Sequence, residues 1–163
     1  MRSVVGSFAM VSLLLVVLPA AGAERQLADL DVCALVPGEE VAEVLGMRLV
    51  STRTSNSPDG KLARCVYLVS GSGPSDEATG AYVVALLPPT RYAELRPFQE
   101  EPTRDVPGIG DGAWIVLHSE SARYDLYALR TGDVTVEVTG EDDSAVRKVA
   151  GLAVPKLAAT AAR

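Results

Sequence analysis

The pattern of apolar and polar positions predicts three helices. The clearest begins at Pro37, which suits the first turn of a helix, and ends at Gly46, a natural helix stop. Between them Val41, Val44 and Leu45 share one face. Similar stripes predict a second helix over 90–99 and a third over the alanine-rich C-terminal segment from 142 onward. Pro155 is expected to kink or end the third helix.

Alternating or wholly apolar runs predict six strands. They lie at 47–54, 62–70, 81–88, 113–120, 122–130 and 133–140. The last two are expected to form a tight hairpin through Thr131-Gly132-Asp133. In the final strand the valines at 134, 136 and 138 are expected to face inward, with Thr135 and Glu137 facing outward.

The order is therefore helix, three strands, helix, three strands, helix. Strands and helices do not alternate singly, which disfavours a doubly wound parallel sheet. The prediction is an α+β fold with an antiparallel sheet and helices packed on one face. The order can also be divided into two duplicated αβββ units followed by a C-terminal helix, although the halves share no sequence identity.

The N-terminal residues predict a secretory signal peptide. Arg2 precedes an apolar run, and Ala21-Gly22-Ala23 supplies the small residues of a cleavage site. The run is shorter than the roughly 20 residues that span a bilayer. We expect a signal peptide over 1–23, a polar lead-in over 24–32, and one α+β domain over 33–163. The protein is then secreted, with no stable membrane anchor after cleavage.

Composition narrows the classes of partner. The chain carries 15 basic and 21 acidic residues, a net charge of −6, without a long basic run. An acidic domain is a poor match for nucleic acid or for an anionic membrane surface. We therefore expect no nucleic-acid partner and a soluble domain outside the cytoplasmic membrane.

Cys33 and Cys65 are the only cysteines, and His118 is the only histidine. In an oxidising compartment an isolated pair is most simply one disulfide. The alternatives are a metal pair or a catalytic thiol. Two thiols and one histidine do not complete the four nitrogen or sulfur ligands of a structural zinc site, so we expect no metal and no cofactor.

The stretch "VPGIGDGAW" places Gly108, Gly110 and Gly112 before the only tryptophan. A nucleotide-binding glycine loop follows a strand and opens a helix, whereas this loop precedes a strand and lacks a following Lys-Ser/Thr. We interpret it as a structural turn in which glycine permits positive φ. The alternative interpretation is that the loop contributes to ligand contact through Trp114.

No catalytic constellation is evident. His118 and Ser119 are adjacent on a predicted strand, so their side chains point to opposite faces. The carboxylates at 39–40 and 141–143 fall at predicted helix starts, where the helix dipole accounts for them. The tyrosines are mostly interpreted as core. An exposed subset formed by Tyr67, Tyr82 and Trp114 is the candidate contact surface for a ligand or partner.

A series of motifs carries a family resemblance: "DVCALVPGEEVAEVLG", then "RCVY", "VPGIGDGAW" and "YALRTGDVTVEV". It resembles an actinobacterial family of small secreted proteins and lipoproteins that is known only as a domain of unknown function. The resemblance covers most of 33–158 and implies an exported α+β domain with a disulfide. A more distant similarity is to the extracellular sensor-like domains of mycobacterial membrane kinases.

Two positions depart from the family pattern. Many members carry a lipidated cysteine at the mature N-terminus, which this chain lacks, and this puts membrane tethering in doubt. Val36 also replaces the usual hydroxyl cap before Pro37.

These observations favour a secreted, non-catalytic cell-envelope protein that binds an unidentified protein or a small apolar ligand. The alternatives are an envelope hydrolase that uses carboxylates or His118, and a ligand-sensing domain with a pocket near Trp114.

Overall fold

The computed structural model describes residues 27–71, 77–130 and 134–161. The predicted signal peptide over 1–23 lies outside the described residues. The helical elements are η1 (Leu27–Asp29), α1 (Val32–Leu35), α2 (Gly38–Leu45), α3 (Arg91–Leu95), η2 (Arg96–Phe98) and α4 (Asp143–Ala161). The strands are β1 (Arg48–Thr54), β2 (Ala63–Ser70), β3 (Gly80–Leu87), β4 (Arg104–Asp105), β5 (Gly112–His118), β6 (Arg123–Arg130) and β7 (Val134–Gly140).

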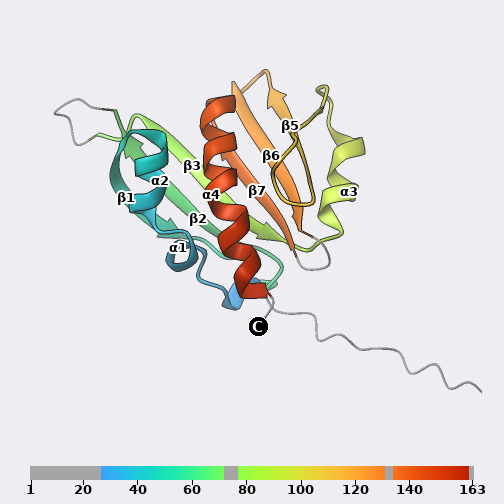
Figure 1. The fold of residues 1–163 in the computed structure, drawn as a ribbon, viewed down its shortest axis with the longest axis horizontal. Coiled ribbons are helices and arrows are strands. Elements are labelled where there is room, and N and C mark those ends of the chain that lie inside the picture. Colours follow the sequence, from blue (N-terminus) through green and yellow to red (C-terminus); the bar gives the residue numbers. More distant parts are fainter. Residues whose placement is uncertain (1–26, 72–76, 131–133, 162–163) are drawn as a thin grey trace, which may run out of the picture.

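All seven strands form one antiparallel sheet in the order β1-β2-β3-β7-β6-β5-β4 (Figure 1). Two meanders, β1-β2-β3 and β5-β6-β7, meet where Val84 of β3 pairs with Val138 of β7. The α+β class and the antiparallel sheet are as predicted. The short edge strand β4 was not predicted, because two residues are too few to show a period.

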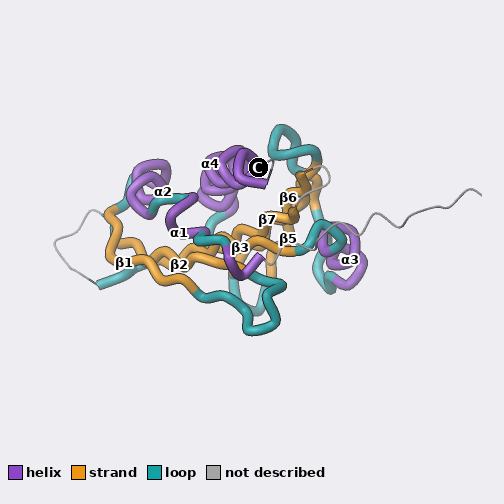
Figure 2. The backbone as a smooth tube through the Cα atoms, turned by 90° about the horizontal axis from the view of Figure 1, so that it is seen from below, coloured by secondary structure: helices purple, strands orange, loops and turns teal. Residues whose placement is uncertain are grey.

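One face of the sheet, here called the helix face, is covered by α1, α2 and α4 (Figure 2). The alternating valines at 134, 136 and 138 point into this layer and are at most 5% exposed, as predicted. Helix α4 lies over the centre of the sheet and contributes Val146, Val149 and Ala153 to the same core. Val32 is fully buried and Leu27 is 7% exposed, so these two apolar positions of the predicted polar lead-in over 24–32 join the core.

The opposite face is called the open face, and the described residues cover only its outer end. There α3 and the residues before it pack on a second, smaller cluster. Leu95 packs against this cluster, and the hydroxyl of Thr135 donates to the carbonyl of Pro89 at 3.2 Å. Thr135 therefore faces away from the valines, as predicted, but is fully buried. The prediction of helices on one face holds for α1, α2 and α4, whereas α3 lies on the other.

The position of α3 also bears on the proposed duplication. The strands are arranged as a duplication predicts, because the two meanders meet at their third strands, β3 and β7. The helices do not, because α2 packs on the helix face and α3 on the open face. A repeat related by an axis perpendicular to the sheet would place both helices on one face.

Helix boundaries follow the local signals closely. Helix α2 ends at Gly46, which has φ 66°, as the glycine stop predicted. Helix α4 continues through Pro155, so this residue does not end it. Pro155 cannot donate to the carbonyl of Gly151, but both residues are exposed, so water can satisfy that carbonyl.

The first helical turn is fastened to the sheet by a disulfide between Cys33 and Cys65, whose Cα atoms are 5.1 Å apart. Cys33 lies in α1 and Cys65 in β2, where it is fully buried. The hydroxyl of Tyr67, also on β2, donates to the carbonyl of Val36 at 2.8 Å. Cys65 and Tyr67, which lie on the same face of β2, thus hold the same N-terminal turn.

The predicted hairpin pairs β6 with β7, with Arg130 opposite Val134. Its turn, Thr131-Gly132-Asp133, lies outside the described residues.

Candidate functional site: a charged hollow on the open face

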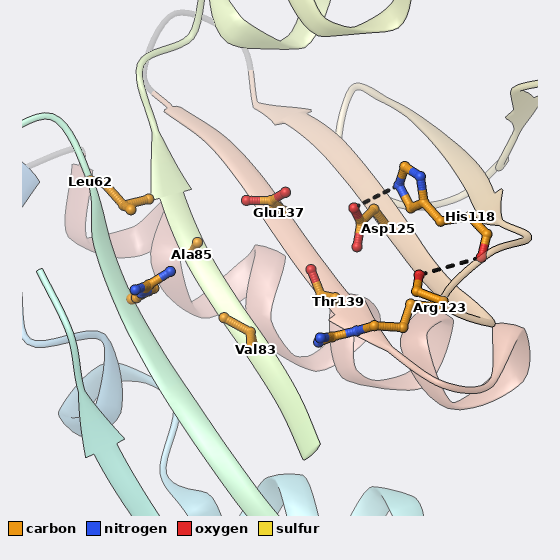
Figure 3. Close-up of a pocket in the computed structure, with 10 residues that line it drawn as sticks. Leu62, Val83, Ala85, His118, Arg123, Asp125, Glu137 and Thr139 are labelled. Atoms are coloured by element: carbon orange, nitrogen blue, oxygen red, sulfur yellow. Dashed lines mark hydrogen bonds and ion pairs between the residues drawn. The ribbon is translucent and has the colours of Figure 1, made fainter. Parts of the chain in front are cut away.

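The open face carries a hollow of about 350 Å³ between β2 and β5 (Figure 3). It is lined mainly by residues whose side chains alternate away from the helix face. These are Leu62, Arg64, Val83, Ala85, His118, Ser121, Arg123, Asp125, Glu137 and Thr139. Its volume falls at the lower end of the range for small-molecule sites.

Strand register explains why these side chains meet. Arg64 lies opposite Ala85, Ala85 opposite Glu137, and Glu137 opposite Tyr127, which forms one row across four strands. The next row on the same face contains Val83, Thr139 and Asp125. Small side chains on β3 and Thr139 on β7 make a low floor, whereas longer charged side chains rise on either side.

Glu137 lies at the centre of the hollow and is only partly exposed (Figure 3). Burial raises the pKa of its carboxyl, and the nearby Asp125 raises it further. A hydrogen bond from the Tyr127 hydroxyl and the charges of Arg64 and Arg91 act in the opposite direction. Desolvation is the largest of these effects, so the neutral form of Glu137 is favoured relative to an ordinary glutamate.

His118 and Asp125 form a pair at the rim. The ring Nε2 of His118 lies 2.9 Å from Oδ2 of Asp125, and the two side chains are 37% and 18% exposed. They come from adjacent strands and point toward one another (Figure 3). The hydroxyl of Ser121 also lines the hollow but donates to the carbonyl of His118, not to its ring.

Two buried polar atoms in the hollow have no hydrogen-bond partner. They are Nε of Arg123, a donor, and Oδ1 of Asp125, an acceptor. Both belong to β6, two residues apart, and both residues line the hollow. A buried donor or acceptor left unpaired costs about 1–3 kcal/mol, so the β6 side of the hollow is where the polar groups of the protein are least well satisfied.

Among the residues that the structure describes, no group of three or more His, Cys, Asp or Glu side chains is arranged to hold a metal ion. The described residues also include no helix long and apolar enough to cross a membrane.

The predicted contact residues Tyr67, Tyr82 and Trp114 lie elsewhere. Their exposures are 0%, 5% and 0%, so none presents a surface to a partner. Tyr67 and Tyr82 fill the core under the helices. Their aromatic bulk suits a core better than a surface, which is the physical reason that they do not form the site.

Trp114 is enclosed on the open face rather than exposed there. It stacks on Tyr127 with ring centroids 4.3 Å apart, and its Nε1 donates to the carbonyl of Tyr92 at 3.3 Å. The hollow does not include Trp114. The pocket near this tryptophan that a sensor would need is therefore not the hollow described here.

The glycine loop is a turn, as interpreted from the sequence. Gly108 and Gly110 have φ of 81° and 59°, and the amide of Asp111 donates to the carbonyl of Leu129 at 2.9 Å. A Cβ on Gly110 would lie 2.5 Å from that carbonyl oxygen. Backbone geometry thus requires glycine at this position, and the turn delivers β5 into the sheet.

Sequence reasoning missed Arg64, Arg123 and Glu137 as site residues. One signal was present, since strict alternation in β6 and β7 puts Arg123, Asp125 and Glu137 on the face opposite the buried valines. The missing information was that these two strands are central and that this part of the face carries no helix.

Comparisons with protein-family models, with curated proteins and with solved structures found no significant match. The family resemblance of the sequence motifs therefore stays a prediction.

Proposed function

We propose that this protein is a secreted, non-catalytic binding domain of the cell envelope and that its ligand or partner docks in the hollow on the open face. The observation that carries the proposal is the pair of unpartnered buried atoms, Nε of Arg123 and Oδ1 of Asp125. The side chains of Arg123 and Asp125 both line the hollow, so an occupant that offers both an acceptor and a donor would complement them.

The residues that line the hollow favour a different class of ligand from the one expected from the sequence. Charged and polar side chains rim the hollow, and its apolar part is limited to small or partly covered residues such as Val83 and Ala85. A polar occupant therefore fits the hollow better than the small apolar ligand expected from the sequence, because burying these charges against an apolar surface would be costly.

The test is capture from envelope extract with the hollow open or filled. Thr139→Trp places a large side chain on the floor of the hollow, at a strand position where an aromatic residue is favoured. Ser51→Trp is the matched control, since Ser51 is exposed on β1, pairs with Leu68 and lies outside the hollow. Bound molecules are identified by mass spectrometry.

We expect a molecule that the wild type and Ser51→Trp retain and that Thr139→Trp loses. Arg123→Gln is the second blocking variant, should Thr139→Trp fail to fold. Equal capture by all four proteins would refute docking in the hollow.

An envelope hydrolase is the second candidate function, and the His118–Asp125 pair is the observation that favours it. An imidazole oriented by a carboxylate is the arrangement of a general base. The expected result for a hydrolase is loss of activity in His118→Ala on any substrate that the wild type cleaves. Unchanged activity in that variant would eliminate this mechanism.

A further inference from the structure

The hollow contains an arginine whose charge is not balanced by an ion pair. Arg123 makes no ion pair with an acidic side chain in the described part of the chain, and its Nε is buried without an acceptor. Its nearest acidic neighbour along the strand, Asp125, is engaged by His118 instead. Arg64 lines the hollow from β2, on the far side of β3 and β7. Two arginines therefore line the hollow from opposite sides, although the guanidinium of Arg64 also donates to the hydroxyl of Ser55 at 3.1 Å.

Glu137 lies between these arginines and would repel an anion if it were charged. The ionisable groups around it are Tyr127 and Asp125 on β6, Arg64 on β2 and Arg91 on α3. His118 and Arg123 also face the same hollow. Arg91 pairs with Glu94 at 3.3 Å. Desolvation is the largest effect on the pKa of Glu137 and raises it, so burial in the hollow favours the neutral form of this carboxyl.

We propose that the hollow binds the carboxylate group of a small ligand, with Arg123 as its principal donor and with Glu137 taking up a proton as the ligand binds. The inference rests on the proposed function, because it names the chemistry of an occupant of the same hollow. It assigns Glu137 a regulatory part, in which acidification strengthens binding.

A carboxylate fits better than a phosphate. The planar fork of a guanidinium matches the oxygens of a carboxylate and of a phosphate alike, so charge decides between the two ligands. A carboxylate brings one negative charge, whereas a phosphate brings up to two beside Asp125 and Glu137. An N–H group close to the ligand carboxylate would donate to the carboxylate of Asp125, whose Oδ1 has no partner.

The test is a titration of the purified, isotope-labelled protein followed by amide NMR shifts along β6 and β7. The probes are N-acetylalanine, its uncharged amide, and inorganic phosphate, each titrated at a series of pH values from about 4 to about 8, because burial raises the pKa of Glu137 above its ordinary value. N-acetylalanine should shift signals near Arg123, Asp125 and Glu137, and bind more tightly at the lower pH. The uncharged amide and phosphate should bind more weakly.

Three substitutions test the roles of Arg123 and Glu137 in binding the probe. Arg123→Gln should weaken binding about tenfold or more, the loss expected for a charge-assisted hydrogen bond. Arg53→Gln is its matched control, because Arg53 is exposed on the open face of β1 and does not line the hollow. Glu137→Gln should abolish the pH dependence and keep tight binding at the higher pH.

A histidine also gains charge between about pH 5 and 8, so His118→Gln is included and should retain the pH dependence. The proposal is overturned if no probe shifts the hollow, if the uncharged amide or phosphate binds as well as the acid, or if the pH dependence follows His118 instead of Glu137. If Thr139→Trp nevertheless loses the molecule captured from envelope extract, these NMR results refute only a carboxylate as the ligand group, and docking in the hollow stands. If that capture is also independent of the hollow, the proposed function fails with it.

Discussion

Replacing each of two glycines in the same turn by alanine should give clearly different losses of stability. Gly108 has φ 81° and Gly110 has φ 59°, so both lie in the left-handed region. A Cβ on Gly108 would meet nothing within 4 Å, whereas a Cβ on Gly110 would lie 2.5 Å from the carbonyl oxygen of Leu129. The pair therefore separates the cost of the backbone conformation from the cost of steric overlap.

The conformational cost of alanine in this region is about 1–2 kcal/mol, partly offset by the lower entropy of the unfolded chain. Gly108→Ala should thus lower the free energy of unfolding by about 1 kcal/mol. Gly110→Ala has the same cost, and its methyl group also pushes Leu129 away from the turn. Overpacking of this kind costs about 1–3 kcal/mol, and the weakened bond from the Asp111 amide to Leu129 adds about 1 kcal/mol. The total for Gly110→Ala is about 3–5 kcal/mol.

Urea unfolding of both variants, followed by the fluorescence of the buried Trp114, measures the two losses. The disulfide is kept intact so that the unfolded states match. Losses that agree within about 0.5 kcal/mol would refute the steric argument, since the additivity of independent effects is no better than that.

Three further predictions concern the N-terminal fastening and the hollow. Reduction of the Cys33–Cys65 disulfide, which closes a separation of 32 residues, should lower the free energy of unfolding by about 3.5–4 kcal/mol on the chain-entropy model, measured by urea unfolding with and without reductant. Tyr67→Phe removes the buried bond to the Val36 carbonyl and should cost about 1–2 kcal/mol in the same assay; an unchanged midpoint would mean that water replaces the hydroxyl. The folded state raises the pKa of Glu137 above its ordinary value of 4.5, so the stability that this carboxyl contributes is full below that pH and is lost as the pH rises. Glu137→Gln should therefore become more stable relative to wild type as the pH increases, and a difference independent of pH would contradict the assigned shift.

Much of the fold could be predicted because its signals are local. Gly46 ends α2 and the valines of β7 face the core, since each follows from the period or conformation of neighbouring residues. The placement of α3 on the open face could not be predicted in this way. Its apolar residues show that it packs on the sheet but not on which face, and that is decided by partners such as Trp114 on β5.

The candidate site was harder to predict, for a related reason. Glu137 and Arg123 occupy polar positions of amphipathic strands, where a polar residue usually means solvent. What makes them candidate site residues is that β7 and β6 are central strands and that the long side chains around small ones leave a hollow. Trp114 drew attention because aromatic residues are enriched in interfaces, but an equally ordinary use of a tryptophan is to fill a core.

The pairing of β3 with β7 has a consequence for the time at which the protein can become compact. The two meanders are joined at the middle of the sheet only when β7 is available, and the 19-residue α4 that covers the centre of the helix face is the last of the described elements. A chain that has not yet released its C-terminal segment therefore exposes the inner surface of its sheet and has no complete core. The complete core of the described fold therefore depends on its two last described elements, β7 and α4.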